Sequence, residues 1–453
     1  MEQKRERFGS RMAVIFAMAG SAIGLGNIWR FPYMVGEHGG AAFILVYILA
    51  TLVVSLPIFI AEVTLGRRSR TGADSAMSKL RPATRRWNLA GALAIFIPLL
   101  IVSYYSVIGG WSLDYLGKSL AGAFVRTDPE NVPGIFDAFI SSAWAPVLAH
   151  LLFLAACAAI VALGVKTGIE KFSKLSIPVL FVLIVAMCIY SVTLPGASAG
   201  VKYLLTPDFS QLTPRSLAYA LGQSFFSLSL GMGAIVTYGS YVSGKENIVV
   251  SSAGTSLSDL LFALLAGMAI MPAVFAAGIE PGAGPGLIFQ SVPYIFSSMG
   301  AESPVISAVV AVVFFLAVVM AAMTSCISLL EVGVSWLREK KGLARWKGCL
   351  LLFVVCGAVG VLCSLSFGPL SSFKIGGMGI FDLCDWTASN ILLLILAFLT
   401  TVFVGHVLSR DEVRDEITNH GTANMRIFPL VYFLIKWVAP LFILLIFITN
   451  FIL

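Results

Sequence analysis

Eleven long apolar stretches dominate this 453-residue chain, and each is long enough to cross a lipid bilayer. A helix needs roughly 20 residues to cross a hydrocarbon core of about 30 Å. Backbone groups find no water in lipid, so we expect each stretch to be a helix that satisfies its own hydrogen bonds. The expected spans are residues 11–37, 41–66, 88–118, 146–164, 171–194, 215–240, 249–279, 303–338, 347–367, 376–405 and 427–451.

The composition agrees with an all-α integral membrane protein. Hydrophobic residues make up 58% of the chain and charged residues only 12%, against roughly 25% charged residues in soluble domains. No polar linker divides the chain, so we expect a single transmembrane domain over residues 1–453. The first eleven residues, MEQKRERFGSR, are strongly charged, and the apolar run that follows shows no small-residue cleavage site, so we expect no cleavable signal peptide. The seven cysteines include no CxxC pair, and we interpret them as small buried residues rather than disulfides or metal ligands.

The positive charges predict how the chain sits in the membrane. Of the 30 lysine and arginine residues, 23 precede span 1 or follow an even-numbered span, five lie on the opposite side and two lie within spans. The richer side faces the cytoplasm, so we expect a multi-pass protein of the plasma (inner) membrane with a cytoplasmic N-terminus and an extracellular C-terminus. The net charge of +7 is then an orientation signal, and we expect no nucleic-acid partner. Two outer loops, 119–145 and 278–302, are expected to form small helices that cap a vestibule.

Two spans contain runs of small and polar residues at the depth where an unbroken helix would cross the middle of the membrane. Span 1 reads AMAGSAIGLGNIWRFPY, and span 6 reads GQSFFSLSLGMGAIVTYGSY. Each glycine in a helix interior costs about 1 kcal/mol relative to alanine, so both runs predict local unwinding. For span 1 alone, close helix packing through a small-xxx-small pattern is the alternative.

The two breaks lie five spans apart, which predicts an inverted repeat of residues 11–194 and 215–405, with 427–451 as an extra helix. Five crossings in each half make the second half enter the membrane from the opposite side. Unwound segments expose carbonyl oxygens to cations, and the N-termini of half-helices present N–H groups to an anion. A sodium ion and a substrate that carries a carboxylate fit this chemistry.

The sequence GSAIGLGNIWRFPY resembles the first helix of the neurotransmitter:sodium symporter family, which includes the bacterial leucine transporter and the animal serotonin, dopamine and GABA carriers. GQSFFSLSLGMG resembles the sixth helix of that family, and the similarity extends over roughly residues 5–405. The resemblance implies the LeuT-type fold, a five-plus-five inverted repeat with broken helices 1 and 6. It also implies sodium-coupled symport by alternating access rather than enzymatic activity. Family members commonly have twelve helices; the lack of a twelfth leaves the oligomeric state open, and a monomer is compatible with the sequence.

The resemblance further implies two sodium sites. The first is formed, together with the substrate carboxylate, by Ala22, Asn27, Ser227 and Asp259. The second is formed by Gly20, Ile23, Ala321, Thr324 and Ser325. Independently, residues 321, 324 and 325 share one face of a helix, and hydroxyl and carbonyl oxygens suit a small cation. The alternative for the two hydroxyl side chains is a hydrogen bond back to the preceding helical turn.

Asp259 is an informative departure from the family pattern. Chloride-dependent relatives generally have a neutral asparagine at this position. An ionised side chain in the middle of a membrane is costly and is usually functional. We therefore expect the carboxylate both to bind sodium and to supply the negative charge that chloride brings elsewhere, so that no chloride is required. The alternative is a protonated, hydrogen-bonded aspartate with a structural role.

The resemblance implies gates on both sides of the binding site. The outer side corresponds to an ionic gate of Arg30 and Asp385 above an aromatic lid of Tyr105 and Phe226. The cytoplasmic side corresponds to a network of Arg5, Ser240, Tyr241 and Glu339. Arg5 has a simpler interpretation as one of the positive charges of the cytoplasmic face. Gly168 and Pro178 flank the cytoplasmic half of span 5, where local unwinding would open a path for sodium release.

The same correspondence outlines an uncharged substrate pocket. Its expected lining is Ala22, Leu25, Gly26, Ile101, Tyr105, Phe226, Ser227, Ser229, Met232, Ser325 and Leu329. With no acidic side chain to pair with a carboxylate-free amine, the substrate should keep its carboxylate and carry an apolar side chain. Met232 replaces a phenylalanine of the leucine-selective relative, and its flexible thioether adapts to different shapes. We therefore predict sodium-driven import of hydrophobic L-amino acids, both branched and aromatic.

Other functions fit the sequence less well. A channel would need a continuous polar lane, and an intramembrane enzyme would need more than four scattered histidines without metal-ligand spacing. A proton-coupled carrier of the same fold is the nearest alternative, although Thr324 and Ser325 favour sodium. The sequence is also compatible with a receptor that senses the substrate without transporting it.

Overall fold

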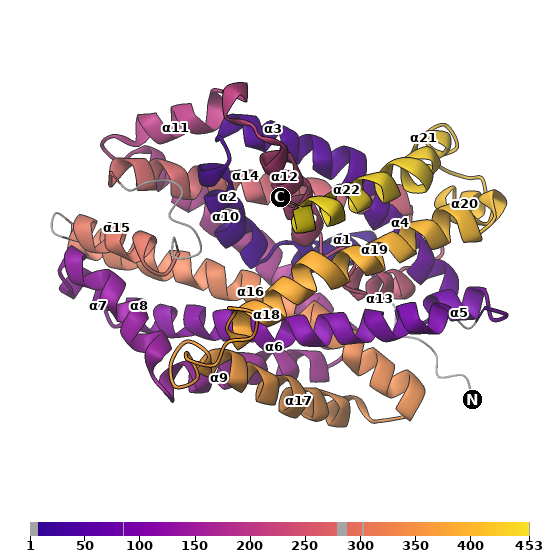
Figure 1. The fold of residues 1–453 in the computed structure, drawn as a ribbon, viewed down its shortest axis with the longest axis horizontal. Coiled ribbons are helices and arrows are strands. Elements are labelled where there is room, and N and C mark those ends of the chain that lie inside the picture. Colours follow the sequence, from indigo (N-terminus) through magenta and orange to yellow (C-terminus); the bar gives the residue numbers. More distant parts are fainter. Residues whose placement is uncertain (1–7, 85, 279–287, 301–302, 453) are drawn as a thin grey trace.

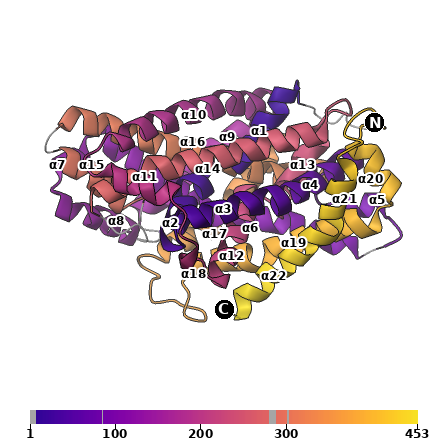
Figure 2. The ribbon, with the colours of Figure 1, turned by 90° about the horizontal axis from the view of Figure 1, so that it is seen from above.

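The computed structural model describes residues 8–84, 86–278, 288–300 and 303–452, and most of these residues are helical. Long helices run side by side along the long axis of the molecule (Figure 1). The small helices at one end are α7 (Ala123–Arg126), α8 (Val132–Ser141), α11 (Ala197–Leu205) and α15 (Ser291–Gly300). Those at the other end are α5 (Ala76–Leu80) and α20 (Arg410–Ile417), as the turned view also shows (Figure 2). The predicted outer and cytoplasmic loops are thus at opposite ends.

Nine continuous helical segments of the described residues are long and apolar enough to cross a membrane. They are Ala41–Ser69, α6 (Trp87–Leu120), α9 (Ala145–Ala162), Val165–Val192, α14 (Ile248–Ala276), α16 (Pro304–Lys341), α17 (Arg345–Leu365), Ile380–Val407 and Phe428–Asn450. Each matches an expected span, so the all-α membrane prediction is confirmed. The span expected at 376–405 begins later, at Ile380, because Gly376 and Gly377 have positive φ values of 59° and 84° that a right-handed helix does not contain.

Four of these spans contain π-helical turns, which are local departures from regular α-helix. The turns are η2 (Thr51–Ser55), η4 (Val165–Ile169), η7 (Ala388–Leu392), η8 (Phe403–Val407) and η9 (Leu434–Val438). The α-helical parts around them are α3 (Ala41–Ala50), α4 (Leu56–Ser69), α10 (Glu170–Val192), α18 (Ile380–Thr387), α19 (Leu393–Val402), α21 (Phe428–Phe433) and α22 (Ala439–Ile452).

Spans 1 and 6 are both broken, as predicted. Three residues separate α1 (Arg11–Ala22) from η1 (Gly26–Arg30) and α2 (Phe31–Glu37), and the chain bends by 53° there. Residues 228–233 separate α12 (Pro214–Ser227) from α13 (Ala234–Tyr241). When α12 and α13 are taken as one span, the described part of the chain contains the eleven expected spans.

Two glycines allow the break in span 6. Gly231 and Gly233 both have a φ of 71°, a conformation that costs glycine little. A Cβ atom on Gly231 would also lie only 2.2 Å from the carbonyl oxygen of Leu393. Only glycine therefore allows the backbone of span 6 to come this close to α19. The unwound conformation therefore follows from both backbone freedom and close packing.

The predicted small outer helices are confirmed for α7, α8 and α15, which fall in the two outer loops. Residues 279–287 and 301–302 of the second loop lie outside the described residues. The helices α5, α11 and α20 were not predicted, because they are too short for apolar periodicity to distinguish them from loops. Two 3₁₀ turns, η3 (Pro129–Asn131) and η5 (Phe209–Gln211), complete the connections.

Ion pairs fasten α20 to the predicted cytoplasmic end of the bundle. Arg67, which is 2% exposed, binds the Glu416 carboxylate and donates to the carbonyl oxygen of Glu246 at 2.5 Å. Arg81 donates to the Glu412 carboxylate. This hydrogen bond, opposed by partial burial, holds the pKa of Glu412 at about 2, below its ordinary value.

Acidification should release α20. Because the pKa of Glu412 is lower in the folded protein than its ordinary value of 4.5, its stabilising contribution is complete above about pH 4.5 and is lost as the pH falls toward about 2. We expect hydrogen exchange of residues 410–417, corrected for the intrinsic pH dependence, to speed up over this window. Glu412→Gln should exchange faster at neutral pH and respond less to acid, and equal responses in both proteins would contradict the assignment.

Candidate functional site

Three polar side chains from different helices meet beside the break in span 1. Asn27 lies in η1, Ser227 ends α12 and Asp259 lies inside α14, and none is more than 1% exposed. The Asn27 amide donates to the Asp259 carboxylate at 2.8 Å and to the Ser227 hydroxyl oxygen at 3.1 Å. The Ser227 hydroxyl donates to the nearer Asp259 carboxylate oxygen at 2.8 Å. Three of the four protein residues expected at the first sodium site are therefore in contact.

The groups in this cluster fit a hard cation. Carboxylate, amide, hydroxyl and carbonyl oxygens are the donors that such ions take. Ala22, the fourth expected residue, ends α1, so its carbonyl belongs to the helix end that has no intrahelical partner. A sodium ion held by these residues would offset the charge of the buried Asp259 carboxylate and attract a substrate carboxylate.

Tyr47 and Gln223 also belong to this cluster, although neither was predicted. The Tyr47 hydroxyl donates to the Ser227 oxygen at 3.4 Å, and the Gln223 amide donates to the Gly26 carbonyl oxygen at 2.8 Å. Both side chains are fully buried. Gln223 could have been found from the sequence, since it is a lone amide in an apolar span, whereas a tyrosine in span 2 carries no such signal.

The second predicted sodium site also assembles around the break in span 1. The Thr324 hydroxyl donates to the Ile23 carbonyl oxygen at 3.3 Å, and the Ser325 hydroxyl to the Ser21 carbonyl oxygen at 3.2 Å. Thr324 also donates back to Ala321 at 2.9 Å, so the alternative of bonding to the preceding turn is partly realised. A Cβ atom on Gly20 would lie 3.4 Å from Thr324 Cβ, which places the two residues against each other.

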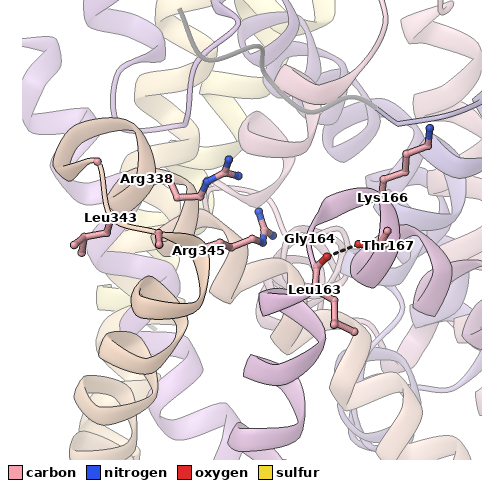
Figure 3. A pocket seen from close by; sticks show the side chains of 9 residues that line it. Leu163, Gly164, Lys166, Thr167, Arg338, Leu343 and Arg345 are labelled. Atoms are coloured by element: carbon pink, nitrogen blue, oxygen red, sulfur yellow. Dashed lines mark hydrogen bonds between the residues drawn. The ribbon is translucent and has the colours of Figure 1, made fainter. Parts of the chain in front are cut away.

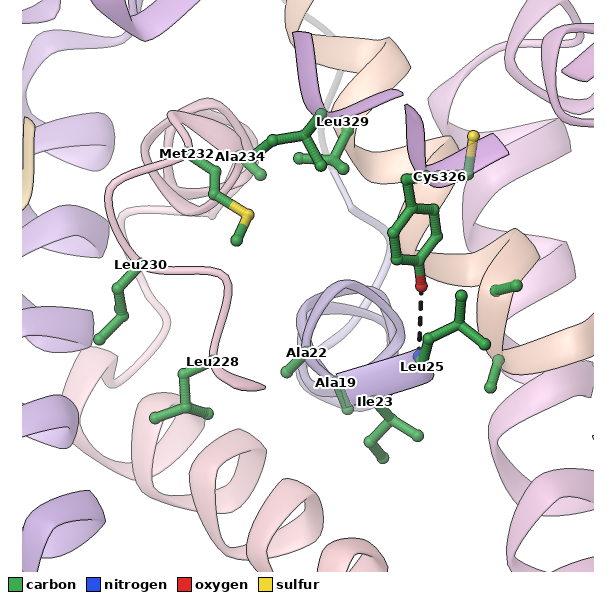
Figure 4. Packing of buried hydrophobic residues seen from close by; sticks show 14 of the residues in the cluster. Ala19, Ala22, Ile23, Leu25, Leu228, Leu230, Met232, Ala234, Cys326 and Leu329 are labelled. Atoms are coloured by element: carbon green, nitrogen blue, oxygen red, sulfur yellow. Dashed lines mark hydrogen bonds between the residues drawn. The ribbon is translucent and has the colours of Figure 1, made fainter. Parts of the chain in front are cut away.

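A small apolar pocket lies between the two helix breaks. It is lined by Ser21, Ala22, Gly24, Gly26, Ile101, Tyr105, Phe226, Ser229, Met232, Ser325 and Leu329. Ala22, Met232 and Leu329 face a common space in Figure 4. The cavity measures about 20 Å³, room for about one water molecule. Side chains must therefore move to admit the predicted amino-acid substrate, and the flexible Met232 is suited to do so.

Two predicted lining residues lie elsewhere. Leu25 lines the outer cavity described below, and Ser227 lies in the sodium cluster. The Leu25 N–H donates to the Tyr105 hydroxyl oxygen at 3.2 Å, so these two predicted lining residues are in contact. Ser229, with a φ of 54°, donates its hydroxyl to the Ser21 carbonyl oxygen at 2.7 Å and joins the two breaks.

Gly24 should be essential to this pocket. A Cβ atom there would lie 2.4 Å from the Ser325 hydroxyl oxygen and 3.0 Å from the Tyr105 hydroxyl oxygen. We expect Gly24→Ala to displace both side chains and to weaken binding of the predicted hydrophobic L-amino acid, offered in radiolabelled form to purified protein, at least about tenfold, or about 1.4 kcal/mol. Gly222→Ala is the matched control, because a Cβ atom on Gly222 meets nothing within 4 Å. Equal binding by both variants would contradict the pocket assignment.

An outer cavity of about 270 Å³ adjoins the small pocket, and both are lined by Gly26, Tyr105 and Phe226. The two aromatic side chains therefore lie where the predicted lid should be. Arg30 and Asp385 line the same outer cavity but form no ion pair in the structure, contrary to the expected closed gate. The Arg30 guanidinium instead lies 5.0 Å from the Phe226 ring centre, and Asp385 accepts a hydrogen bond from Ser389 at 3.1 Å.

Tyr241, one of the predicted inner-gate residues, contacts a residue that was not predicted, Glu331. The Tyr241 hydroxyl donates to the Glu331 carboxylate at 2.7 Å, and Arg345 forms an ion pair with it. Arg345 also donates to the Val161 carbonyl oxygen at 2.6 Å, so this network joins α13, α16, α17 and α9. An acid inside the long apolar α16 is the sequence signal that could have revealed Glu331.

Two other predicted inner-gate residues, Glu339 and Ser240, make hydrogen bonds of their own. Glu339 accepts hydrogen bonds from the Gly72 N–H at 3.1 Å and from Ser335 at 2.9 Å. Ser240 donates to the Thr237 carbonyl oxygen. Arg5 lies outside the described residues.

A wider cavity of about 720 Å³ opens beside the inner network. It is lined by Leu163, Gly164, Lys166, Thr167, Arg338, Gly342, Leu343, Ala344 and Arg345 (Figure 3). These residues come from the end of α9, from η4 and from the connection between α16 and α17. Arg345 therefore belongs both to the inner network and to the wall of this cavity.

Glu62 is a further buried residue that supports the break in span 6. Its carboxylate, 1% exposed, accepts a hydrogen bond from the Gly231 N–H at 2.8 Å. An unwound backbone within a membrane needs such partners, because lipid supplies none. A lone acid in the apolar run LPIFIAEVTLG is a signal that the sequence contained.

The predicted cytoplasmic half of span 5 is helical in this structure. η4 ends at Ile169 and continues into α10, which contains Pro178. A Cβ atom on Gly168 would lie 2.1 Å from the Ile160 carbonyl oxygen, so this glycine permits close packing on α9. The unwinding hypothesis for sodium release stays a prediction.

The apolar helices define a protein that spans the membrane several times, and its family and relatives make it a sodium-coupled secondary transporter rather than an enzyme. The chain belongs to the sodium:neurotransmitter symporter family, which matches residues 5–131 and 140–453. The family predicted from the first and sixth helices is thereby confirmed.

Similar proteins match almost the whole chain. The crystal structure of MhsT in complex with L-phenylalanine has a TM-score of 0.90 and 39% identity, covering 99% of this chain and 100% of that one. The uncharacterized sodium-dependent transporter YhdH of Bacillus subtilis is 37% identical, over 99% of this chain and 98% of that protein. A sodium- and chloride-dependent taurine transporter of Canis lupus familiaris is 27% identical, over 91% of this chain and 73% of that protein.

Proposed function

We propose that this transporter imports hydrophobic L-amino acids together with sodium, without a chloride requirement. The contact of Asn27, Ser227 and Asp259 beside a pocket without charged side chains is the observation that carries this proposal. The sodium cluster provides positive charge for the substrate carboxylate. Ile101, Met232 and Leu329 provide an apolar surface for its side chain.

The carboxylate of Asp259 supports chloride independence. It accepts hydrogen bonds from Asn27 and Ser227, where a neutral residue would need an added anion to balance bound sodium. The next turn of α14 on the same face holds Ala263, which is fully buried and uncharged. Asp259 is therefore the acid that would take the place of chloride.

Two sodium ions would drive the cycle. Each ion that enters down a potential of 100 mV contributes about 2.3 kcal/mol. Sodium and substrate bind from the outer cavity, the lid of Tyr105 and Phe226 closes, and Arg30 approaches Asp385. The network of Tyr241, Glu331 and Arg345 then opens toward the cytoplasm. In the proposed orientation the N-terminus is inside the cell and the C-terminus is outside, and residues 11–194 and 215–405 form the two repeats.

Uptake into proteoliposomes tests this function. Radiolabelled phenylalanine, leucine and tryptophan would be offered with sodium, chloride and proton gradients imposed one at a time; phenylalanine is the ligand named for the similar MhsT structure. We expect sodium-driven uptake of all three that is unchanged when gluconate replaces chloride. Uptake driven by protons alone would contradict the second sodium site, and sodium-dependent binding without uptake would indicate a sensor.

A further inference from the structure

Two cysteines on consecutive helices meet at the predicted outer end of the bundle. Cys363 lies two residues before the end of α17, and Cys384 lies in α18. Their sulfur atoms are 3.9 Å apart. All seven cysteines are free thiols, as interpreted from the sequence, but the meeting of these two could not be seen there.

The two thiols differ in access to solvent. Cys363 is fully buried, whereas Cys384 is partly exposed. Phe381, Asp382 and Asp385, which flank Cys384 in the chain, line the outer cavity. In the proposed orientation this end of α18 faces the outside of the cell, where disulfides form and persist.

We propose that Cys363 and Cys384 are a redox modification site, in which an external disulfide compound converts them into a disulfide that restrains the outer gate. The Cys384 thiolate would attack one sulfur of the compound and release its other half as a thiolate. The Cys363 thiolate would then attack the Cys384 sulfur and release the second half. The two protons pass to the released thiolates, so the compound is reduced to two thiols as the protein is oxidised.

The geometry permits this bond with a modest movement. A disulfide bond is about 2.05 Å long, so sulfur atoms at 3.9 Å must approach by about 2 Å. The η7 turn directly follows α18 and replaces α-helical with π-helical hydrogen bonds. Rotation of the cysteine side chains with a small shift of α18 would close the gap.

The bond would act on transport through α18. This helix carries Asp385, and the inference rests on the proposed outer gate of Arg30 and Asp385. Asp385 must move toward Arg30 for that gate to close, because the two form no ion pair in the structure. A link from Cys384 to α17 would hold α18 in one position and slow each opening and closing of the gate.

Oxidised glutathione is the probe for the chemistry. Transporter in right-side-out proteoliposomes would be oxidised, its remaining thiols alkylated, and its peptides analysed by mass spectrometry. We expect a linked peptide pair containing Cys363 and Cys384, reversed by dithiothreitol. Cys157 and Cys326, both fully buried, should stay reduced and serve as internal controls. Absence of the linked pair from folded protein would overturn the proposal, whatever the transported substrate.

The effect on the gate needs a separate readout. We expect oxidation to lower the initial uptake rate at least threefold and to slow hydrogen exchange of residues 380–387, with both changes reversed by reduction. Cys384→Ala, which lacks the thiol that attacks first, should be insensitive to oxidised glutathione in both measurements. Cys363→Ala should stop at a mixed disulfide of Cys384 with glutathione and give no linked peptide pair. The exchange measurement does not depend on the substrate, so it separates a wrong substrate from a wrong site. A formed disulfide that changes neither quantity would overturn its role at the gate.

Discussion

Asp259→Asn is expected to lower the sodium affinity of the first site about 100-fold, a loss of about 2.7 kcal/mol. The carboxylate is fully buried and is held by Asn27 and Ser227, so its negative charge acts on a bound cation with little screening. Sodium-dependent uptake in chloride-free buffer should become undetectable. The measurement is the sodium dependence of amino-acid binding and uptake in proteoliposomes.

Added chloride should partly restore uptake by this variant. An asparagine at position 259 leaves the site one negative charge short, and chloride would supply that charge. Asp382→Asn is the matched control, because Asp382 lines the outer cavity and is exposed. It should keep chloride-independent uptake. If Asp259→Asn transported normally without chloride, the aspartate would have only a structural role.

Glu331→Ala is expected to destabilise the protein by about 3–5 kcal/mol, the usual loss when one member of a buried ion pair is removed. The Glu331 side chain is 0% exposed and Arg345 is 11% exposed, so little water compensates for the missing carboxylate. The Tyr241 hydroxyl loses its acceptor in the same change. Unfolding by heat or denaturant in detergent would measure the loss.

The same variant should leave the inner side open more of the time. We expect faster labelling of a cysteine introduced at Ser240 by a reagent added from the cytoplasmic side, relative to the same cysteine in the parent protein. Lys341→Gln is the control on the same helix, because Lys341 is exposed at the end of α16 and does not belong to the predicted gate. Similar labelling in both variants would show that Glu331 stabilises the fold without controlling the gate.

The two helix breaks could be predicted because their cause is local. Glycine and serine runs in spans 1 and 6 weaken a helix wherever it packs, so the unwound segments are visible in the sequence. The sodium-site residues were found by similarity to family motifs, and the contacts of Asn27, Ser227 and Asp259 agree with them. The helix-face spacing of Thr324 and Ser325 added an independent reason.

Other parts of the site depended on contacts between helices that are far apart in the sequence. The sequence showed that three residues are charged but not what they contact, because their partners come from other spans. These residues are Glu62, Glu331 and Arg345. Arg30 and Asp385 were expected to pair, yet sequence does not determine which conformation of a moving gate a structure adopts. Tyr47 became part of the cluster only because spans 2 and 6 pack together.

The sequence by itself determined that the chain lies in a lipid bilayer, how many spans it has, their predicted orientation and where both breaks fall. These features depend on hydropathy, charge asymmetry and glycine content, which act over a few turns of one helix. The tertiary structure decided which polar groups share a site and which thiols meet. Those outcomes depend on how helices far apart in the chain pack against one another. A buried carboxylate such as Asp259 becomes a candidate ligand only once the helix carrying it lies beside the break in span 1.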